Sequence, residues 1–366
     1  MSAELKGLDA SRRGMMLGSA ALLFAPMWLA GVAPAIARTG GAASVAREIP
    51  AHRLPVPDTI SAELRPVVGA PLPPGWDAIP GSDEAWRSLV KATSEGAGPA
   101  LEAIRQRLGV RLERSRIAGV PVFISTPDPL PKANRDRLLV HFHGGGYVLF
   151  PGEIGAGEGM LMAGYGRFRV ISVDYRMPPD HPFPAALDDA LAVWKSLLAE
   201  HDPSRMGMFG TSAGGGLTLA TLLRAKAEKL PLPAVIAPGS PWVDLQGQGD
   251  SILANQFTDN SLVSFEGWVG AAAKLYAGSA DLADPLISPI HGDFAGLPPA
   301  ILTSGTRDLL LSDTVRTHRK LREAGIDAAL QVFEAQSHAQ FLTPFVPETA
   351  EAFGEIARFF DRHLAA

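Results

Sequence analysis

The chain has 366 residues, 46% of them hydrophobic and 19% charged, enough to bury one large core or two modest ones. A formal net charge of −5 gives no basic surface, so we expect no nucleic-acid partner. The chain has no cysteine, which excludes disulfides and thiolate zinc sites, and its nine histidines show no helical ligand spacing. We therefore expect no metal and no cofactor.

The first 37 residues have the order of parts typical of an export signal. Ser11-Arg-Arg-Gly-Met-Met-Leu17 resembles the twin-arginine motif, and an uncharged stretch then continues to Ala35-Ile-Ala37, a small-x-small cleavage sequence. An uncharged run of this length could also anchor the chain in a membrane, but its prolines and glycines disfavour a long helix. We expect cleavage after Ala37, no stable membrane anchor, and a periplasmic or secreted protein.

Two segments precede the main domain. Residues 38–80 are rich in proline, glycine and alanine without a sustained period, which indicates a linker or extended arm. Residues 81–109 carry apolar side chains at helical spacing, interrupted at Gly96-Ala-Gly98. We expect two short helices there, forming an N-terminal cap.

Residues 110–366 change to a repeated strand and helix pattern. Two strands flank Gly119 as an antiparallel pair, and apolar strand segments then alternate with helical ones. The later strands are expected at residues 137–143, 169–174, 206–209, 234–238, 300–304 and 328–333. This alternation predicts an α/β fold, a doubly wound and mostly parallel sheet covered on both faces.

One stretch, residues 243–288, interrupts this alternation. It shows no clear strand, and within it only Phe265 to Tyr276 has a helical pattern. Long insertions into such sheets usually have a function, and these sheets bind ligands at the carboxyl ends of their strands. We expect this insertion to form a lid over that edge, together with the two cap helices.

The most informative motif is Gly210-Thr-Ser-Ala-Gly214, a G-x-S-x-G sequence between an apolar strand and a helical segment. A serine on such a turn has a strained backbone, and the two glycines leave room for the sharp reversal. The turn exposes the hydroxyl at a helix N-terminus, where negative charge is stabilised. Ser212 is therefore a candidate nucleophile, although a serine N-cap on a glycine-rich turn would have the same sequence.

A second glycine-rich motif, His143-Gly-Gly-Gly146, follows the strand at residues 137–143. Glycines let backbone N–H groups face a cavity without side chains in the way. Such an N–H group and that of the residue after the nucleophile form an oxyanion hole in this architecture. We expect Gly145, Gly146 and Ala213 to be the donors, and His143 to support the loop structurally.

A nucleophilic serine needs a base and an acid that orients it. His338 lies in a short loop after the last expected strand. His318 and His363 fall within expected helices and His291 in the return from the insertion, so we expect these three to be solvated surface residues. Asp308 follows the strand at residues 300–304, and its rival Asp313 suits a helix N-cap. We expect the order Ser212, Asp308, His338, which is the chain order of α/β-hydrolases.

Taken together, these motifs resemble the hormone-sensitive-lipase-like branch (bacterial family IV) of the α/β-hydrolases, from about Leu138 to the C-terminus. With Thr211 before the serine, the motif is similar to that of the family's GTSAG subgroup. The sequence departs from the family at the acid, where the usual D-P-L motif is replaced by Asp308-Leu-Leu310. The resemblance implies a serine carboxylesterase with an N-terminal helical cap, acting on short- to medium-chain esters or lactones. The family's oxyanion donors correspond to Gly145, Gly146 and Ala213.

Several alternatives stay open on the sequence. A lactone hydrolase or a peptidase would use the same three residues, and a small-molecule binder without catalysis could share the fold. Charged residues near the expected sheet edge, Asp174, Arg176 and Asp188, suggest a structural salt bridge. Aromatic residues fit either a pocket or a core: Trp86, Tyr147, Phe265, Trp268 and Phe341. The expected partner is a small ester or lactone, and a homodimer is one option for the oligomeric state.

Overall fold

The computed structural model describes residues 46, 48–51, 53–95 and 98–365. Residues Arg53–Ala366 form one compact unit, which contains all the helices and strands given below. The expected export signal, residues 1–37, lies outside the described residues. None of the helices in the described part of the chain is long and apolar enough to cross a membrane.

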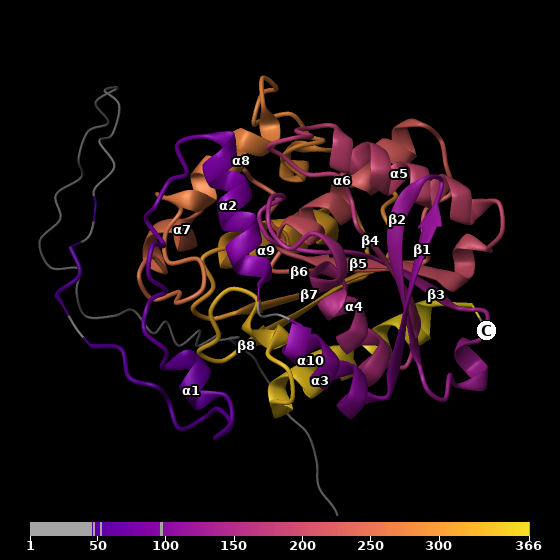
Figure 1. Ribbon diagram of the computed structural model, residues 1–366, viewed down its shortest axis with the longest axis horizontal. Coiled ribbons are helices and arrows are strands. Elements are labelled where there is room, and N and C mark those ends of the chain that lie inside the picture. The colour runs from indigo at the N-terminus through magenta and orange to yellow at the C-terminus, as the bar shows by residue number, and fades with distance from the viewer. Residues whose placement is uncertain (1–45, 47, 52, 96–97, 366) are drawn as a thin grey trace, which may run out of the picture. The chain divides into compact units, whose positions relative to one another are not determined.

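Eight strands in the described part form one sheet with the order β1-β2-β4-β3-β5-β6-β7-β8 (Figure 1). β1 and β2 are antiparallel, β2 pairs antiparallel with β4, and the strands from β4 to β8 are parallel. Their bounds are β1 (Val110–Ile117), β2 (Val120–Pro127), β3 (Leu138–Phe142), β4 (Arg169–Val173), β5 (Met206–Thr211), β6 (Val235–Gly239), β7 (Ala300–Gly305) and β8 (Ala328–Phe333). The predicted α/β class is confirmed.

The helices lie between these strands and before them. Their bounds are α1 (Arg65–Val68), α2 (Asp83–Ser94), α3 (Gly98–Leu108), α4 (Gly157–Leu161), α5 (Ala185–Leu198), α6 (Ala213–Ala227), α7 (Asp250–Ala254), α8 (Trp268–Ala277), α9 (Leu311–Glu323) and α10 (Pro347–His363). Local sequence explains several of the ends. The Ser82 side chain caps α2 by accepting the N–H of Ala85, and α10 begins with Pro347, where no N–H partner is needed.

The sheet separates two apolar cores, because side chains alternate between its faces along each strand. In β3, Leu138 and Val140 belong to the core that α5, α6 and α9 cover. Leu139 belongs to the core that α3, α4 and α10 cover. Figure 1 shows α5 and α6 on one side of the sheet and α3 and α10 on the other. Burial on both faces agrees with the apolar strand sequences from which the sheet was predicted.

The chain changes direction across the sheet at β3. From β3 it passes through α4 to β4 on one side, while β5, the neighbour of β3 on the other side, continues through α6 to β6. α4 and α6 cover opposite faces, so the loops after β3 and β5 diverge and leave a crevice between them. Open α/β sheets bind ligands at such a switch point. The His143–Gly146 loop and Ser212 follow these two strands.

The segments outside the strand–helix alternation cover the carboxyl edge of the sheet only in part. Trp86 of α2 packs with Ala272 of α8 against Val148 and Leu149, in the loop after β3. α3, the second expected cap helix, instead packs with α4 in the core on one face of the sheet, because Leu101 and Ile104 are apolar and buried there. α2 and the insertion thus lie next to the loop after β3, and α3 does not.

The expected linker at residues 38–80 is partly folded onto the domain. Leu64, next to α1, is fully buried, and Ser61 donates its hydroxyl to the Glu348 carboxylate at the start of α10 (2.8 Å). Ile60, Leu64 and Val68 recur every four residues and are buried in one small cluster. This pattern is too short to stand out in a segment rich in proline and glycine, so the sequence predicted a linker or extended arm where the structure has a packed segment.

Candidate active site

Ser212 lies on the sharp turn between β5 and α6. Its φ of 62° and ψ of −124° put a non-glycine residue in a strained region of backbone space. Backbone hydrogen bonds hold it there: its N–H donates to Gly239 O (2.9 Å), and its carbonyl accepts from Gly216 and Trp242. The residue is 8% exposed and lines a cavity. The structure thus has the strained serine that the motif predicts.

The glycines on either side of this turn are required by close contact with β3. A Cβ on Gly210 or on Gly214 would overlap the carbonyl oxygen of Phe142. Any larger residue would therefore push β3 away from the turn, and with it the loop that follows β3. The spacing of the motif reflects this contact as well as the turn itself.

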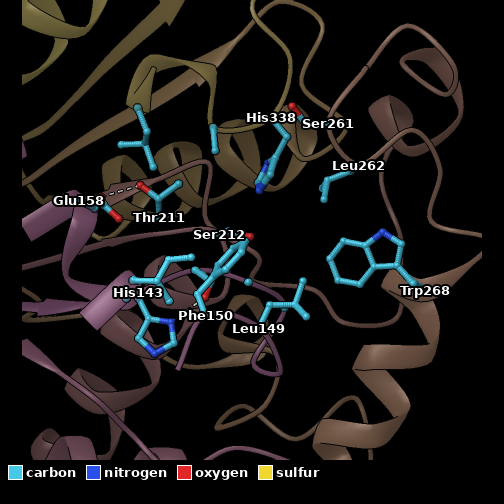
Figure 2. A pocket seen from close by; sticks show the side chains of 17 residues that line it. His143, Leu149, Phe150, Glu158, Thr211, Ser212, Ser261, Leu262, Trp268 and His338 are labelled. Atoms are coloured by element: carbon cyan, nitrogen blue, oxygen red, sulfur yellow. Dashed lines mark hydrogen bonds between the residues drawn. The ribbon is translucent and has the colours of Figure 1, made fainter. Parts of the chain in front are cut away.

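Asp308 and His338 come together at the same edge of the sheet. His338 Nδ1 lies 3.0 Å from Asp308 Oδ1, and both side chains are buried. Figure 2 shows the imidazole pointing across the cavity toward Ser212. No hydrogen bond joins Ser212 and His338 among the described residues, and such a bond is often long before substrate binds. Ser212 and His338 thus line one cavity, and Asp308 lies buried beside the His338 ring.

Neighbouring hydroxyls fix the Asp308 carboxylate. Oδ2 accepts hydrogen bonds from Ser240 and Ser304, and Oδ1 also accepts the N–H of Leu310 (2.8 Å). Burial raises the pKa of Asp308, but the charge of His338 and these hydrogen bonds outweigh it, so the net pKa lies below its usual range. Asp308 is therefore charged beside the ring.

The electrostatics of His338 follow from the same contacts. Burial lowers its pKa, but the charge and hydrogen bond of Asp308, with the charges of Asp259 and Asp313, raise the net pKa above the ordinary 6.5. The protonated ring is thus stabilised, as a general base requires once it has accepted a proton.

The loop after β3 presents unused N–H groups to the cavity. Gly145 and Gly146 have φ of 99° and 63°, which side chains rarely adopt. The Gly145 carbonyl turns away and accepts the N–H groups of Val148 and Leu149. Within the described residues, the N–H groups of Gly145, Gly146 and Ala213 have no hydrogen-bond acceptor. These donors are free to bind an oxygen beside Ser212.

His143 is packed rather than exposed for proton transfer. Its Nδ1 lies 2.8 Å from Gly144 O, and its ring stacks on Tyr175 at 4.2 Å between centroids. Tyr175 also donates its hydroxyl to the His143 carbonyl (2.7 Å). Burial lowers the pKa of His143 to about 4, so the ring is neutral at pH 7. These contacts agree with a supporting role for His143.

The cavity has a volume of about 340 Å³, at the small end of the range for small-molecule sites, which is roughly 300–1,000 Å³. Figure 2 shows Glu158 and Thr211 to one side of Ser212, and Leu262 and Trp268 to the other. Apolar residues Leu149, Phe150, Ile154 and Leu342 complete much of the wall. The cavity beside Ser212 is therefore small and its wall is largely apolar.

Comparisons with known proteins agree with this arrangement. Residues 139–342 match the family model described as alpha/beta hydrolase fold. The chain belongs to the α/β-hydrolase family. It is similar to the crystal structure of an esterase named E25, with a TM-score of 0.85 and 38% identity over 87% of this chain and 99% of that one. It is also similar to an esterase of the bacterial hormone-sensitive lipase family, with a TM-score of 0.65 and 31% identity over 77% and 98%.

Curated relatives of this hydrolase support the same placement. It is 29% identical over 254 residues to an esterase of Acinetobacter venetianus, covering 68% of this chain and 82% of the relative. It is 31% identical over 234 residues to an acetyl-hydrolase of Streptomyces hygroscopicus, covering 63% and 77%. The predicted family, the hormone-sensitive-lipase branch of the α/β-hydrolases, is confirmed.

Two carboxylates of this hydrolase that the motifs did not reveal also lie at the site. Glu158 of α4 lines the cavity, accepts the Thr211 hydroxyl (2.7 Å) and lies 3.1 Å from His141 Nε2. Its only sequence signal is a single charge in an otherwise uncharged stretch, residues 154–166. Asp259 of the insertion accepts the backbone N–H of His338 (3.0 Å), and nothing in the sequence distinguishes it from other aspartates there.

Other candidates lie elsewhere in the hydrolase. Of the aromatic residues that could have lined a pocket, Trp268 lines the cavity, while Trp86, Tyr147 and Phe341 are buried core residues. Phe265 is partly buried and contacts Trp242 edge-on. Trp268 differs from the others because it begins α8, directly beside Gly146.

Three predictions about charged residues need correction or detail. Asp313 is not the N-cap of α9: it lies in the first turn, is buried, and accepts the N–H groups of Val243 and Asp244, because the insertion crosses this helix. Arg176 forms a bidentate salt bridge with Asp189, not with Asp188, because Asp189 is on the buried face of α5. Among the rival histidines, which were expected to be solvated, His291 is exposed, His318 binds the Ala328 carbonyl and His363 pairs with Asp327.

Proposed function

We propose that this carboxylesterase of the hormone-sensitive-lipase family hydrolyses short- to medium-chain esters through an acyl-enzyme on Ser212. One observation carries the proposal. The Asp308–His338 pair faces Ser212 across a cavity into which the Gly145–Gly146 loop brings unused N–H groups. In this proposal these groups supply the four parts that acyl transfer needs: nucleophile, base, acid and oxyanion donors.

The first half-reaction forms the acyl-enzyme. His338 Nε2 accepts the proton of the Ser212 hydroxyl while Oγ attacks the ester carbonyl, and Asp308 stabilises the resulting imidazolium. The carbonyl oxygen becomes an oxyanion and accepts hydrogen bonds from Gly145, Gly146 and Ala213. His338 then donates its proton to the leaving alkoxide, the carbon–oxygen bond breaks and the alcohol departs.

The second half-reaction releases the acid. A water molecule attacks the acyl carbon while His338 accepts one of its protons, and the same three N–H groups stabilise the second tetrahedral intermediate. Collapse of this intermediate breaks the bond to Ser212 Oγ, which regains its proton from His338. The carboxylic acid leaves, and the enzyme returns to its starting state.

The cavity supports the proposed substrate size. Its volume of about 340 Å³ is small, and Trp268 and Glu158 bound it on opposite sides of Ser212. An indole blocks a long chain sterically, and burying an apolar chain against a carboxylate is unfavourable. Both features favour acyl and alcohol groups of modest length.

The test is turnover of p-nitrophenyl esters by S212A. We predict that S212A folds and that kcat falls by about 10⁶. The small remaining rate comes from substrate binding and the oxyanion donors, which the substitution leaves in place. Undiminished activity in S212A would remove the serine mechanism. A panel of acyl chain lengths and lactones on the wild-type enzyme would then define the substrate, and lactones alone as substrates would contradict the ester proposal.

We also propose that the enzyme is exported and cleaved after Ala37. The support is the twin-arginine-like Ser11–Leu17 and the Ala35–Ala37 ending, both in the sequence alone. N-terminal sequencing of the protein from a periplasmic fraction tests it, and a mature chain that retains residues 1–37 would contradict it.

A further inference from the structure

A second buried carboxylate, on Asp259, lies beside the candidate triad. It belongs to the insertion between β6 and β7, and its side chain has no exposed surface. Oδ1 accepts the N–H groups of Ser261 (2.7 Å) and Leu262 (2.9 Å), which closes a turn of the insertion itself. This half of the carboxylate shapes local backbone, as many aspartates in turns do.

The other oxygen reaches two different loops of the sheet edge. Oδ2 accepts the N–H of Leu309 (2.7 Å), the residue after Asp308, and the N–H of His338 itself (3.0 Å). One carboxylate therefore joins the loop that carries the acid, the loop that carries the base, and the insertion that borders the cavity. Ser261 and Leu262, the residues held by Oδ1, are themselves part of the cavity wall.

The charge of Asp259 has no ordinary counter-ion. Among the described residues no lysine or arginine forms a salt bridge with it. A buried carboxylate is costly unless hydrogen bonds and opposite charge compensate it. Four backbone N–H groups supply the hydrogen bonds. The opposite charge comes from the imidazolium of His338, the nearby cation that the reaction creates.

We propose that Asp259 is a positioning residue of the esterase, holding the backbones of His338 and Leu309 so that ring and carboxylate keep their alignment toward Ser212. The proposal rests on the function proposed above, because it acts through His338. An amide in place of the carboxylate has one acceptor oxygen and can serve only one of the two donor pairs. Asparagine at this position must therefore release either the turn or the two triad loops.

The negative charge of Asp259 also affects the pKa of His338. The carboxylates whose charges raise the pKa of His338 are Asp308 of the acid loop, Asp259 of the insertion and Asp313 of α9. The groups that act on Asp259 are Asp308, which raises its pKa, and His338, which lowers it, while burial raises its pKa most. Removing the Asp259 charge leaves fewer anions beside the ring, so the pKa of His338 falls.

The experiment compares D259N with D284N. Asp284 lies in the same insertion and its carboxylate likewise closes its own turn, accepting the Leu286 N–H (2.8 Å). In the described part of the chain, no hydrogen bond or ion pair joins its carboxylate to the triad loops. For each variant, kcat with p-nitrophenyl butyrate is divided by the number of serines titrated by an organophosphate. We expect D259N to lose roughly 10- to 100-fold in kcat, the order that a small misplacement of a catalytic group produces, with KM little changed. The acid limb of its kcat/KM profile moves to lower pH.

The proposal fails if D259N matches D284N in kcat per titrated serine and in pH profile, with any defect confined to a lower Tm. If D259N does not fold, D259S replaces it, since serine keeps a small acceptor without the charge, and the same comparison decides. S212A is measured alongside. An active S212A would overturn the proposed function, whereas an inactive S212A with a fully active D259N would overturn only the role of Asp259.

Discussion

The oxyanion loop offers a sharp test in the substitution G145A. Gly145 has a φ of 99°, and an added Cβ would lie 2.7 Å from Leu149 O and 2.8 Å from Phe150 Cδ2. Backbone and aromatic ring are both packed, so the loop must shift, and the N–H of Gly145 shifts with it. Losing one oxyanion donor raises the barrier by about 2.7–4 kcal/mol, so kcat should fall about 10²- to 10³-fold.

A matched control separates this effect from backbone strain. Gly152 follows in the same connection between β3 and β4 with a φ of 74°, but a Cβ there would meet no atom within 4 Å. G152A therefore carries the penalty of a side chain at positive φ, about 1–2 kcal/mol of stability, without touching the donor. Its Tm should fall while its kcat stays near that of the wild type.

The assay is kcat and KM for p-nitrophenyl butyrate, with Tm from thermal unfolding measured on the same samples. We expect G145A to lose kcat far beyond any loss in G152A, at a temperature where both variants are folded. Equal kcat values in the two variants would refute the assignment of Gly145 as a donor.

Three further predictions follow from the site and the sequence. The raised pKa of His338 places the acid limb of the kcat/KM profile above pH 6.5, since the ring must be neutral to accept a proton. D308N removes the charge that raises this pKa, so the limb should move to lower pH. A limb that D308N leaves in place would contradict the pairing of Asp308 with His338. Replacing Trp268 by alanine removes a cavity wall, so activity on longer acyl chains should rise relative to acetate by about fourfold per buried methylene, about 0.8 kcal/mol each; an unchanged chain-length profile would place the acyl group elsewhere. Replacing Arg12 and Arg13 by lysine should leave the protein in the cytoplasmic fraction on immunoblots, and normal export would argue against the twin-arginine signal.

Motifs tied to backbone geometry could be predicted from the sequence. The Gly210–Gly214 turn needs glycine where β3 approaches, and the His143–Gly146 loop needs glycine at positive φ, so both left recognisable spacings. Asp308 and His338 were found because each follows a strand that ends at the same edge of a parallel sheet. Their positions after consecutive strands of the chain were enough to predict that the two side chains lie together.

Contacts between distant segments could not be predicted in this way. Asp259 accepts the backbone N–H groups of Leu309 and His338, which lie 50 and 79 positions further along the chain. No local sequence pattern predicts hydrogen bonds between residues this far apart. The burial of Leu64 and the choice of Asp189 over Asp188 likewise depend on which face packs inward. Trp268 lines the cavity while Trp86 does not, although both lie on helices, because only tertiary packing decides which aromatic faces the serine.

The most direct test of the central claim is mass spectrometry of the enzyme after reaction with an organophosphate. The account predicts one covalent adduct, on the peptide that contains Ser212, and its absence from S212A. No adduct on the active wild-type enzyme, or an adduct on another residue that persists in S212A, would contradict the claim that Ser212, His338 and Asp308 form a working serine hydrolase.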